Sequence, residues 1–374
     1  MTDIDLRKLH EDVVFGRAGG KIIWQPRILA WFTEREYHKT PLPERYRGMT
    51  PPEIFRDLNC SNRNYDFNSC FSRKFGKNTE LYTEKISETK TKHAIRSPRG
   101  EVYSVVETSP HSYHHIIRKW LLETPEDMKL YTDILNDSNW AFDQGQFAHI
   151  DLLWGERGAP TMFMPRVSVQ DLYVDTMGVE NAVTALYDWQ DTVRDYFAVL
   201  HENHIKMIDI INSSPIKIIN FGDNIHSATL SPRLYVKYVE PCYQERCARL
   251  HAHGRWVCAH WDGDVKPLLK YAKSSGLDGI EAITPKPQGD VTLEEIKAAL
   301  GSEMFLVDGL PAVYFDELFS EQELIDCTKR IIELFAPNLI LGISDEISPT
   351  GDLERIRIVG AIVDEYNASI ETEG

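Results

Sequence analysis

Short apolar segments alternate with helix-length segments through the second half of the chain. The apolar segments are residues 216–221, 256–259, 279–283, 304–307 and 339–343. Each is apolar along its length, which is typical of a strand buried on both faces. The intervening segments, among them 232–253 and 265–273, carry apolar residues at helical spacing, and Thr292 and Ser320 have the form of helix N-caps. Strands that alternate with helices in this way predict a parallel sheet.

The first half of the chain is less regular. Residues 21–28 and 161–164 read as further strands, and 179–186 and 192–212 as helices. Residues 41–108 are polar and aromatic, contain a predicted hairpin turn at 97–100, and form too long a stretch for a simple loop. We therefore predict a single α/β domain over residues 1–374, a (β/α)₈ TIM barrel with an N-terminal insertion or lid at about 41–108. An open doubly wound sheet is the alternative, which the lack of a glycine-rich phosphate loop disfavours.

The composition excludes several classes of function. The chain has 41 Lys and Arg against 57 Asp and Glu, a formal charge of -16, so a nucleic acid would meet net repulsion. No apolar run approaches the ~18 residues of a membrane span, and the N-terminal residues lack the apolar region of a secretory signal. The 6 cysteines form no C-x-x-C pair, as expected of reduced thiols. We expect a cytoplasmic protein whose partner is a small-molecule substrate, not a nucleic acid or a membrane.

Polar residues stand at the carboxyl ends of the predicted strands. They are Asp223 and Asn224, His260 and Asp262, Glu281, Asp308, and Asp345 and Glu346. In a parallel barrel these strand ends share one face, which is where barrel enzymes carry out their chemistry. The pattern predicts an enzyme, with Asp223, His260 and Glu281 as catalytic residues and Asn224 and Asp308 as substrate-binding residues.

His260 and Asp262 form the sharpest pair of candidate metal ligands. On an extended segment, side chains two residues apart point the same way, so both can bind one ion. Asp345 or Glu346 would add an oxygen ligand, as would Glu281, and such a set suits Zn²⁺ or a harder divalent ion. The alternative is that Asp262 caps a helix while His260 is a hydrogen-bonded core residue.

Two other groups of residues are weaker candidates. His111, His114 and His115 would share a helix face if Pro110 began a helix, but no carboxylate or Cys stands among them, so we favour a solvated helix start. Cys258 lies two residues before His260, and we favour a packing role over a nucleophilic one.

The chain resembles the uroporphyrinogen decarboxylase superfamily over about two thirds of its length. The motifs that carry the resemblance are Phe221-Gly222-Asp223-Asn224, Leu230-Ser231-Pro232-Arg233, His251-Ala252-His253-Gly254, Cys258-Ala259-His260-Trp261-Asp262-Gly263 and Gly342-Ile343-Ser344-Asp345-Glu346. The superfamily implies a (β/α)₈ barrel and contains two chemistries. One is cofactor-free decarboxylation of a tetrapyrrole, and the other is methyl transfer to corrinoid proteins by zinc-containing methyltransferases.

The resemblance is closer to the methyltransferases. Their zinc site begins with His-x-Cys-Gly, and here His260 matches the His, Asp262 replaces the Cys, and Asp345 or Glu346 falls near a later Cys of that site. Carboxylate in place of thiolate makes the ligand set harder, which favours activation of an ether, hydroxyl or carboxylate oxygen over a thiol. The decarboxylases carry two arginines in an N-terminal motif, of which this chain keeps Arg27.

The resulting hypothesis is a metal-dependent methyltransferase that moves a methyl group from a small, methoxylated substrate to a corrinoid protein. Zn²⁺ is the expected metal. The first alternative is a metal-free decarboxylase of uroporphyrinogen or another polycarboxylate, in which Arg27 and Arg166 would bind substrate carboxylates. The second is a barrel that binds a ligand without catalysis. Superfamily precedent suggests a homodimer for the decarboxylases.

Overall fold

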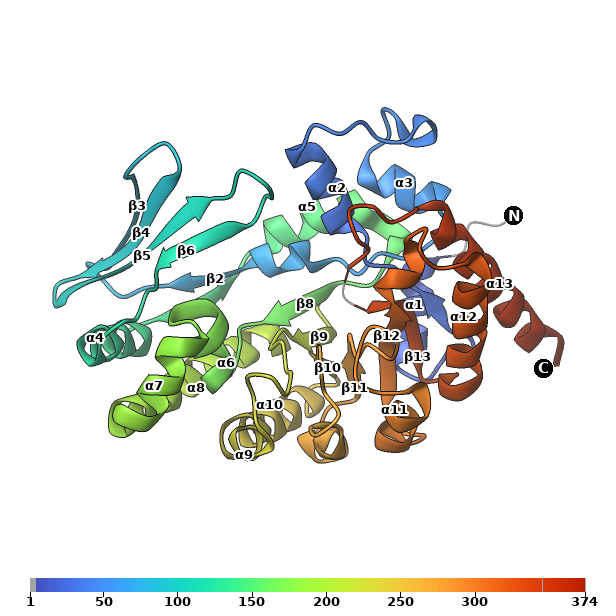
Figure 1. Cartoon of the computed structure of the whole chain (residues 1–374). Coiled ribbons are helices and arrows are strands. Elements are labelled where there is room, and N and C mark those ends of the chain that lie inside the picture. The colour runs from blue at the N-terminus through green and yellow to red at the C-terminus, as the bar shows by residue number, and fades with distance from the viewer. Residues whose placement is uncertain (1–4, 345, 374) are drawn as a thin grey trace.

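A computed structural model gives the structure of residues 5–344 and 346–373. A parallel sheet of seven strands forms its centre (Figure 1). The strands run in the order β1 (Ile23–Trp24), β13 (Leu339–Ser344), β12 (Phe305–Pro311), β11 (Gly279–Glu281), β10 (Trp256–His260), β9 (Ile218–Phe221) and β8 (Thr161–Met164). All five strands predicted in the second half of the chain are present, and all pairings in this sheet are parallel.

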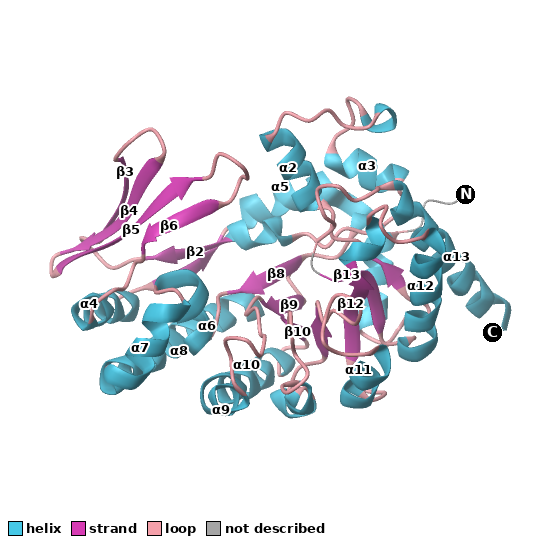
Figure 2. Ribbon diagram, in the orientation of Figure 1, coloured by secondary structure: helices cyan, strands magenta, loops and turns pink. Residues whose placement is uncertain are grey.

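The strands from β9 to β13 are buried along their whole length, as the apolar segments predict. Helices lie along the outer side of the curved sheet (Figure 2). They include α8 (Gln190–Asn212), α10 (Glu240–His251), α11 (Leu293–Leu300), α12 (Glu321–Phe335) and α13 (Glu354–Glu373). Thr292 and Ser320 are N-caps as predicted, and each forms a capping box with the Glu three residues later.

Two of the predicted helices take other forms. The segment 232–251 is a short helix α9 (Pro232–Leu234), a π-helical turn η5 (Tyr235–Val239) and then α10. Pro241 stands in the first turn of α10, where its missing N–H is tolerated. The prediction of an α-helix at 265–273 is wrong. This part of the chain forms two 3₁₀ turns, η6 (Leu269–Tyr271) and η7 (Lys273–Ser275), whose backbone hydrogen bonds join residues three apart.

The gap between β1 and the chain before β8 holds an extended segment. The Ser61 N–H donates to the carbonyl of Trp24 at 3.0 Å, and the Asn62 N–H donates to the carbonyl of Arg157 at 2.8 Å. Gly158 packs so closely on Asn62 that a Cβ there would lie 2.0 Å from the Asn62 carbonyl oxygen. Residues 61–62 therefore bond to β1 on one side and to Arg157, which precedes β8, on the other.

The region of the predicted insertion carries a separate antiparallel sheet. Its strands are β3 (Glu80–Lys85), β4 (Lys90–Ser97), β5 (Gly100–Thr108) and β6 (His115–Lys119), and it projects from the rest of the molecule (Figure 1). Ser97 pairs with Gly100, which confirms the predicted hairpin turn. Strand β2 (Phe71–Lys74), which precedes this sheet in the chain, pairs with β7 (Asn139–Phe142), which follows it, in a separate two-stranded sheet.

The histidine-rich segment before β6 is not helical. The side chains of Ser109 and Ser112 accept hydrogen bonds from the N–H groups of His111 and His114, at 3.1 and 3.2 Å. These local bonds compete with the helical ones, so the chain bends and enters β6 at His115. The predicted helix is wrong, although His111, His114 and His115 are exposed to solvent as expected.

The remaining α-helices lie between residues 6 and 188. They are α1 (Leu6–Val14), α2 (Leu29–Tyr37), α3 (Pro51–Asp57), α4 (Pro125–Asn136), α5 (Gln144–Trp154), α6 (Ser168–Gln170) and α7 (Val179–Asp188), with 3₁₀ turns η1 (Glu44–Tyr46), η2 (Tyr65–Cys70) and η3 (Gly155–Arg157), a π-helical turn η4 (Asp171–Thr176) and a final 3₁₀ turn η8 (Ala312–Phe315). None of the helices in the described part of the chain is both long and apolar enough to cross a membrane.

Candidate active site

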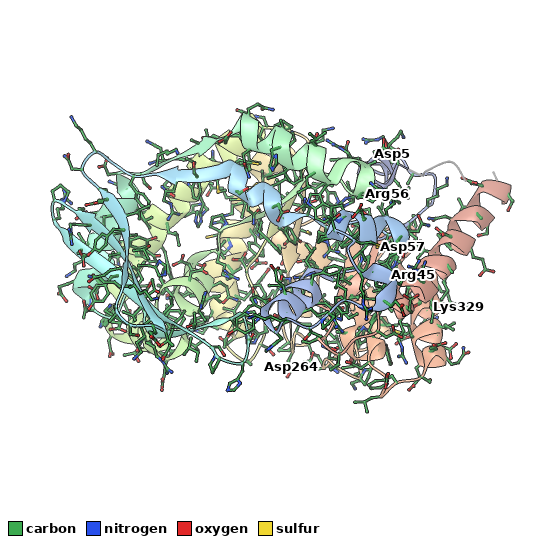
Figure 3. The ribbon with its side chains drawn as sticks, turned by 90° about the horizontal axis from the view of Figure 1, so that it is seen from above. Asp5, Arg45, Arg56, Asp57, Asp264 and Lys329 are labelled. Carbon is green, nitrogen blue, oxygen red and sulfur yellow. The ribbon has the colours of Figure 1, made fainter. Side chains whose placement is uncertain are left out.

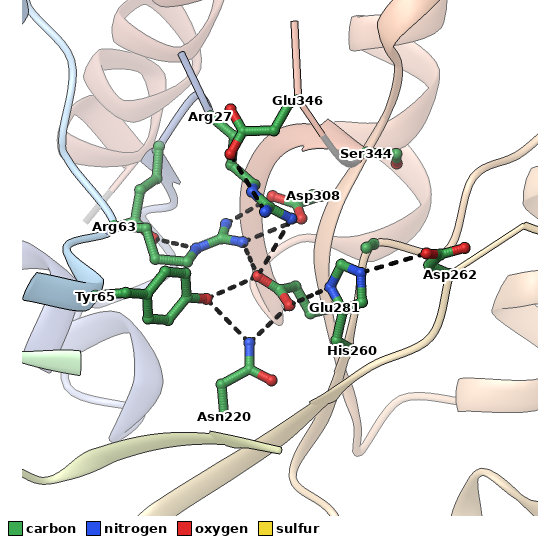
Figure 4. A network of polar contacts seen from close by, with 12 residues as sticks. Arg27, Arg63, Tyr65, Asn220, His260, Asp262, Glu281, Asp308, Ser344 and Glu346 are labelled. Carbon is green, nitrogen blue, oxygen red and sulfur yellow. Dashed lines mark hydrogen bonds and ion pairs between the residues drawn. The ribbon is translucent and has the colours of Figure 1, made fainter. Parts of the chain in front are cut away.

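Polar side chains from four strands meet at the carboxyl ends of the central sheet (Figure 4). His260 is the last residue of β10, Glu281 is the last residue of β11, and Asp308 lies in β12. Asn220 comes from β9, and Arg63 and Tyr65 come from the segment between β1 and β2. The structure thus brings together strand ends that are far apart in the sequence, as the barrel prediction requires.

Glu281 is the centre of this network. Its side chain is fully buried and accepts hydrogen bonds from Arg63 Nη1 at 2.5 Å, the Tyr65 hydroxyl at 2.8 Å and Asn220 Nδ2 at 2.7 Å. Burial raises the pKa of the Glu281 carboxyl, but the positive charges of Arg63 and His260 outweigh it and hold that pKa well below its usual range. Glu281 is therefore a carboxylate that is fixed in position.

Arg63 joins Glu281 to Asp308. Its two terminal nitrogens contact the Asp308 carboxylate, with Nη2–Oδ1 at 2.6 Å and Nη1–Oδ2 at 3.0 Å, and Nε donates to Gln25 Oε1 at 3.0 Å. This bidentate geometry is the strongest form of arginine–carboxylate pairing. Asp308 was predicted to bind substrate, but both of its oxygens are engaged by Arg63.

Arg27 is a second arginine near Glu281. Its Nη2 lies 3.3 Å from Glu346 Oε1, and its Nη1 lies 4.0 Å from Glu281 Oε1. Glu346 is thus paired with an arginine. Asp345, the other predicted ligand at this strand end, lies outside the described residues.

His260 lies between two carboxylates. Its Nδ1 is 2.7 Å from Glu281 Oε2, and its Nε2 is 3.7 Å from Asp262 Oδ2. Burial lowers the pKa of the imidazole, but Glu281 and Asp262 have the larger combined effect and raise it to about 9. Asp262 is only partly exposed, and its contact with His260 lowers its own pKa.

The His260–Asp262 pair has the spacing of two ligands of one ion. Two ligands at ordinary zinc distances stand roughly 3.4 Å apart in a tetrahedral site. Metal-binding histidines commonly use their second nitrogen to contact a carboxylate, as His260 contacts Glu281. Within residues 5–344 and 346–373, no three His, Cys, Asp or Glu side chains come together as ligands of one ion. The described residues therefore offer two candidate ligands, His260 and Asp262, and no complete ligand set.

Asp262 is also held by a chain of polar contacts, which begins at the same carboxylate oxygen, Oδ2, that faces His260. Asn224 Nδ2 donates to Asp262 Oδ2 at 3.4 Å, and Asn224 Oδ1 accepts from Arg166 Nη2 at 3.1 Å. Arg166 Nη1 in turn donates to Asp175 Oδ1 at 2.8 Å. Asn224 has φ +51°, a left-handed conformation that Asn tolerates better than most residues. Arg166 and Asn224, both predicted to bind substrate, thus contact each other, and Asn224 also contacts Asp262.

A cavity of about 250 Å³ opens beside Asp262. Its lining includes Gln170, Tyr173, Asn224 and His226 as well as Asp262. Gln170 Nε2 donates to the Asn224 carbonyl at 3.1 Å, which ties one wall of the cavity to the segment that follows β9. A small molecule in this cavity would lie next to one end of the His260–Asp262 pair.

An aromatic stack borders the network near His260. The rings of Tyr65 and Phe163 stack with centroids 3.6 Å apart. The rings of Phe163 and His260 are nearly perpendicular to each other, with centroids 6.5 Å apart. Gly222 leaves room for Phe163, because a Cβ at that position would lie 2.9 Å from the ring. The stack gives the site one apolar side.

Two predicted residues have other surroundings. Asp223 is fully buried, and its oxygens accept from the Val167 N–H and the Tyr243 hydroxyl, each at 2.7 Å. Burial raises the pKa of Asp223. Its contacts tie β9 to the segment after β8 and do not include the Glu281 network. Burial also raises the pKa of the Cys258 thiol well above its usual value, which disfavours a thiolate nucleophile.

Sequence reasoning missed Arg63 and Asn220 as members of the site. Arg63 lies in a polar stretch, residues 61–64, that has no periodicity and no recognisable motif. Asn220 did leave a signal, since it is a polar residue inside the otherwise apolar segment 216–221. A buried polar side chain in a strand has to find a partner, and this one finds Glu281.

Comparisons with known proteins identify relatives. The family model described as uroporphyrinogen decarboxylase (URO-D) matches residues 171–366. A methyltransferase from Methanosarcina mazei has a similar structure, with a TM-score of 0.56 at 12% sequence identity, over 95% of this chain and 97% of that chain. A B12-independent methionine synthase from Shewanella sp. W3-18-1 is less similar, with a TM-score of 0.42 at 10% identity, over 94% of this chain and 98% of that chain. No curated protein sequence matches the chain.

At 12% identity, the likeness to the Methanosarcina mazei methyltransferase shows a shared fold. The family model is the stronger finding, because it spans more than half of the chain and includes β9 to β13 with His260, Glu281 and Asp308. On this match the chain belongs to the uroporphyrinogen decarboxylase family.

Proposed function

We propose that the protein is a metal-dependent methyltransferase, which moves a methyl group from a small-molecule substrate to a corrinoid carried on a partner protein. The observation that carries this proposal is the arrangement of His260, with Glu281 at Nδ1 and Asp262 facing Nε2 beside a cavity. His260 and Asp262 would hold a divalent metal, and Asp345 is the third ligand that we propose. Zn²⁺ is the metal that suits this set best.

The charge of the site supports a cation as its ligand. The network contains the carboxylates of Asp262, Glu281, Asp308 and Glu346 and the guanidinium groups of Arg27 and Arg63. His260, whose pKa is raised to about 9, is protonated when no metal is bound and would give up that proton to bind one, which would leave two negative charges that the arginines do not balance. A divalent cation would neutralise them, whereas a polycarboxylate substrate would add to them.

A bound metal would act as a Lewis acid toward the substrate atom that loses its methyl group. The residues of this chain would prepare the site. Glu281 would orient the His260 ring and increase the basicity of Nε2, and Asn224 would hold Asp262 in place. The Tyr65–Phe163 stack would keep water from one side of the reacting group.

The donor set favours an oxygen-bound methyl group in the substrate. Imidazole and carboxylate are harder ligands than thiolate, so the ion they hold prefers an ether or hydroxyl oxygen over a sulfur. A methoxylated aromatic compound matches this preference and the apolar wall of the site. We further propose that residues 61–64 complete a closed eight-stranded barrel between β1 and β8.

A metal-free decarboxylase is the second candidate function, and the description of the matching family favours it. Its substrate carboxylates would need cations. Arg63 is fully engaged by Glu281, Asp308 and Gln25, Arg27 is paired with Glu346, and Arg166 with Asp175. Because these arginines already have protein partners, we rank decarboxylation second.

Methyl transfer to free cob(I)alamin tests the proposal. The purified protein is incubated with methoxylated benzenes, and methylcobalamin is followed by its absorbance, before and after removal of metal by a chelator. We expect turnover that a chelator abolishes and that zinc restores, and that is lost in His260→Ala. Release of carbon dioxide from a polycarboxylate, unaffected by chelators, would instead support the decarboxylase.

A further inference from the structure

A second cavity adjoins the one beside Asp262. Its volume is about 300 Å³, at the small end of the range for ligand pockets. Helix α7 borders one side, and α9 with η5 borders the other. Tyr173 and Thr229 line both cavities, so the two are neighbours separated by shared side chains.

Two cations line this second cavity. Arg233 and Lys237 are four residues apart on one helical face, and neither has an ion pair with any described residue. The Lys237 ammonium lies 4.5 Å from the centre of the Tyr238 ring. None of the described residues that line the cavity is Asp or Glu. In a chain with a formal charge of -16, two neighbouring cations with no carboxylate between them form a local positive centre.

The opposite wall of the cavity is apolar and aromatic. Val179, Val183 and Tyr187 are spaced four residues apart along α7, and they are 42%, 40% and 75% exposed. Val183 and Tyr187 line the cavity of Arg233, and Val179 lines the cavity of Asp262. Side chains of this kind are usually buried, so the stripe offers an apolar surface that runs from one cavity to the other.

We propose that this cavity binds the anionic end of a small organic molecule with a flat apolar body. Arg233 and Lys237 would bind its carboxylate or phosphate, and the body would lie on the α7 stripe against Tyr187. This inference rests on the proposed function in one respect: the end of the ligand opposite its anionic group is the end that reaches Asp262. It assigns to the substrate a negative charge remote from the transferred methyl group.

The charge of the ligand is the property to test. The probes are 3-phenylpropanoate and its neutral analogue 3-phenylpropanol, titrated into the full-length protein by calorimetry. The variant is Arg233→Gln with Lys237→Gln, which keeps the side-chain stems and removes both charges. The control is Arg56→Ala with Lys329→Ala, which makes the same change in net charge at exposed sites on α3 and α12, near the C-terminal helix (Figure 3).

We expect the wild-type protein and the control to bind the anion about tenfold more tightly than the alcohol, and the Gln variant to lose this preference. Affinity for the alcohol should be equal in all three proteins, which shows that the variant is folded. Equal binding of the two probes by the wild type, or an unchanged preference in the Gln variant, would overturn the assignment.

The same titration in His260→Ala with Asp262→Ala separates this inference from the proposed function. Neither residue lines the second cavity, so we expect the preference for the anion to persist. If methyl transfer is never observed but the preference is found and depends on Arg233 and Lys237, the proposed function fails and the anion site stands.

Discussion

The imidazole of His260 lies 2.7 Å from Glu281 at Nδ1 and faces Asp262 at 3.7 Å from Nε2. Glu281 therefore holds the ring through Nδ1. The other nitrogen, Nε2, faces Asp262, which lines the cavity. Glu281 is itself fixed by Arg63, Tyr65 and Asn220, so the orientation of His260 is set by side chains from several strands.

Glu281 should strengthen metal binding by His260. Glu281→Gln keeps the shape of the side chain and removes the charge that supports His260. Loss of such a partner typically weakens metal binding by about 10–100-fold. Zinc affinity, measured by competition with a chromophoric chelator, should fall by that amount. The matched control is Glu346→Gln, which alters the pairing with Arg27 and should leave zinc affinity within about threefold of wild type. Equal loss in the two variants would contradict the role given to Glu281.

A second prediction concerns Asn224. Asn224→Asp preserves the tolerance for a positive φ and introduces a negative charge within 3.4 Å of Asp262. The amide donor to Asp262 is lost, and repulsion should displace that carboxylate. We expect kcat/KM for methyl transfer to fall about tenfold or more, with little change in thermal stability. Unchanged kcat/KM would show that Asn224 does not position Asp262.

Gly342 permits the Arg63–Asp308 pair to form. A Cβ at this position would lie 2.1 Å from Asp308 Oδ1 and 2.9 Å from the Gln25 carbonyl oxygen. Gly342→Ala should therefore destabilise the protein by about 1–3 kcal/mol, measured by urea unfolding. The control, Gly145→Ala in the exposed first turn of α5, should change stability by less than about 1 kcal/mol. Similar values for the two variants would contradict this reading of Gly342.

Asp171 makes stability depend on pH. It is buried, accepts hydrogen bonds from the Tyr196 hydroxyl at 2.5 Å and from Thr176 Oγ1 at 3.1 Å, and burial together with the charge of Asp175 raises its pKa to about 7. The unfolded chain has the ordinary value of 3.8, so between pH 4 and pH 7 the folded state binds more protons than the unfolded state. The contribution of Asp171 to stability is therefore full below about pH 4 and is lost as the pH rises toward 7.

The variant Asp171→Asn removes this titration. The free energy of unfolding of the wild type, relative to that of the variant, should fall between pH 4.5 and pH 7.5 in urea titrations. Near-ultraviolet circular dichroism at both pH values checks that the two proteins keep the same tertiary structure. A difference between the proteins that does not change with pH would contradict the raised pKa of Asp171.

The sequence predicted those parts of the fold and site that depend on local pattern. The apolar segments predicted the strands β9 to β13. Polar residues at the carboxyl end of a buried strand had to lie at one edge of the sheet, and this predicted the place of His260, Glu281 and Asp308. The turn at Ser97 and Gly100 was predictable for the same reason, since turn residues act locally.

Long-range pairing could not be predicted in this way. Arg63 has no pattern around it, and its role follows only from the packing of residues 61–64 between β1 and the chain before β8. Asp223 looked catalytic from its place after β9, yet its partners are Val167 and Tyr243, which no spacing rule connects to it. The segment after Pro110 had a helical spacing of histidines, but hydrogen bonds from two nearby serines decided its conformation.

The metal content of the protein shows whether His260 and Asp262 hold an ion. The protein is purified without an affinity tag, beside His260→Ala with Asp262→Ala and the control His253→Ala with Asp264→Ala, which changes an exposed His and an exposed Asp. Elemental analysis of all three should find zinc or another divalent metal near one equivalent in the wild type and the control, and almost none in the site variant. No metal in the wild type after reconstitution, or equal metal in all three proteins, would contradict a metal site at His260 and Asp262.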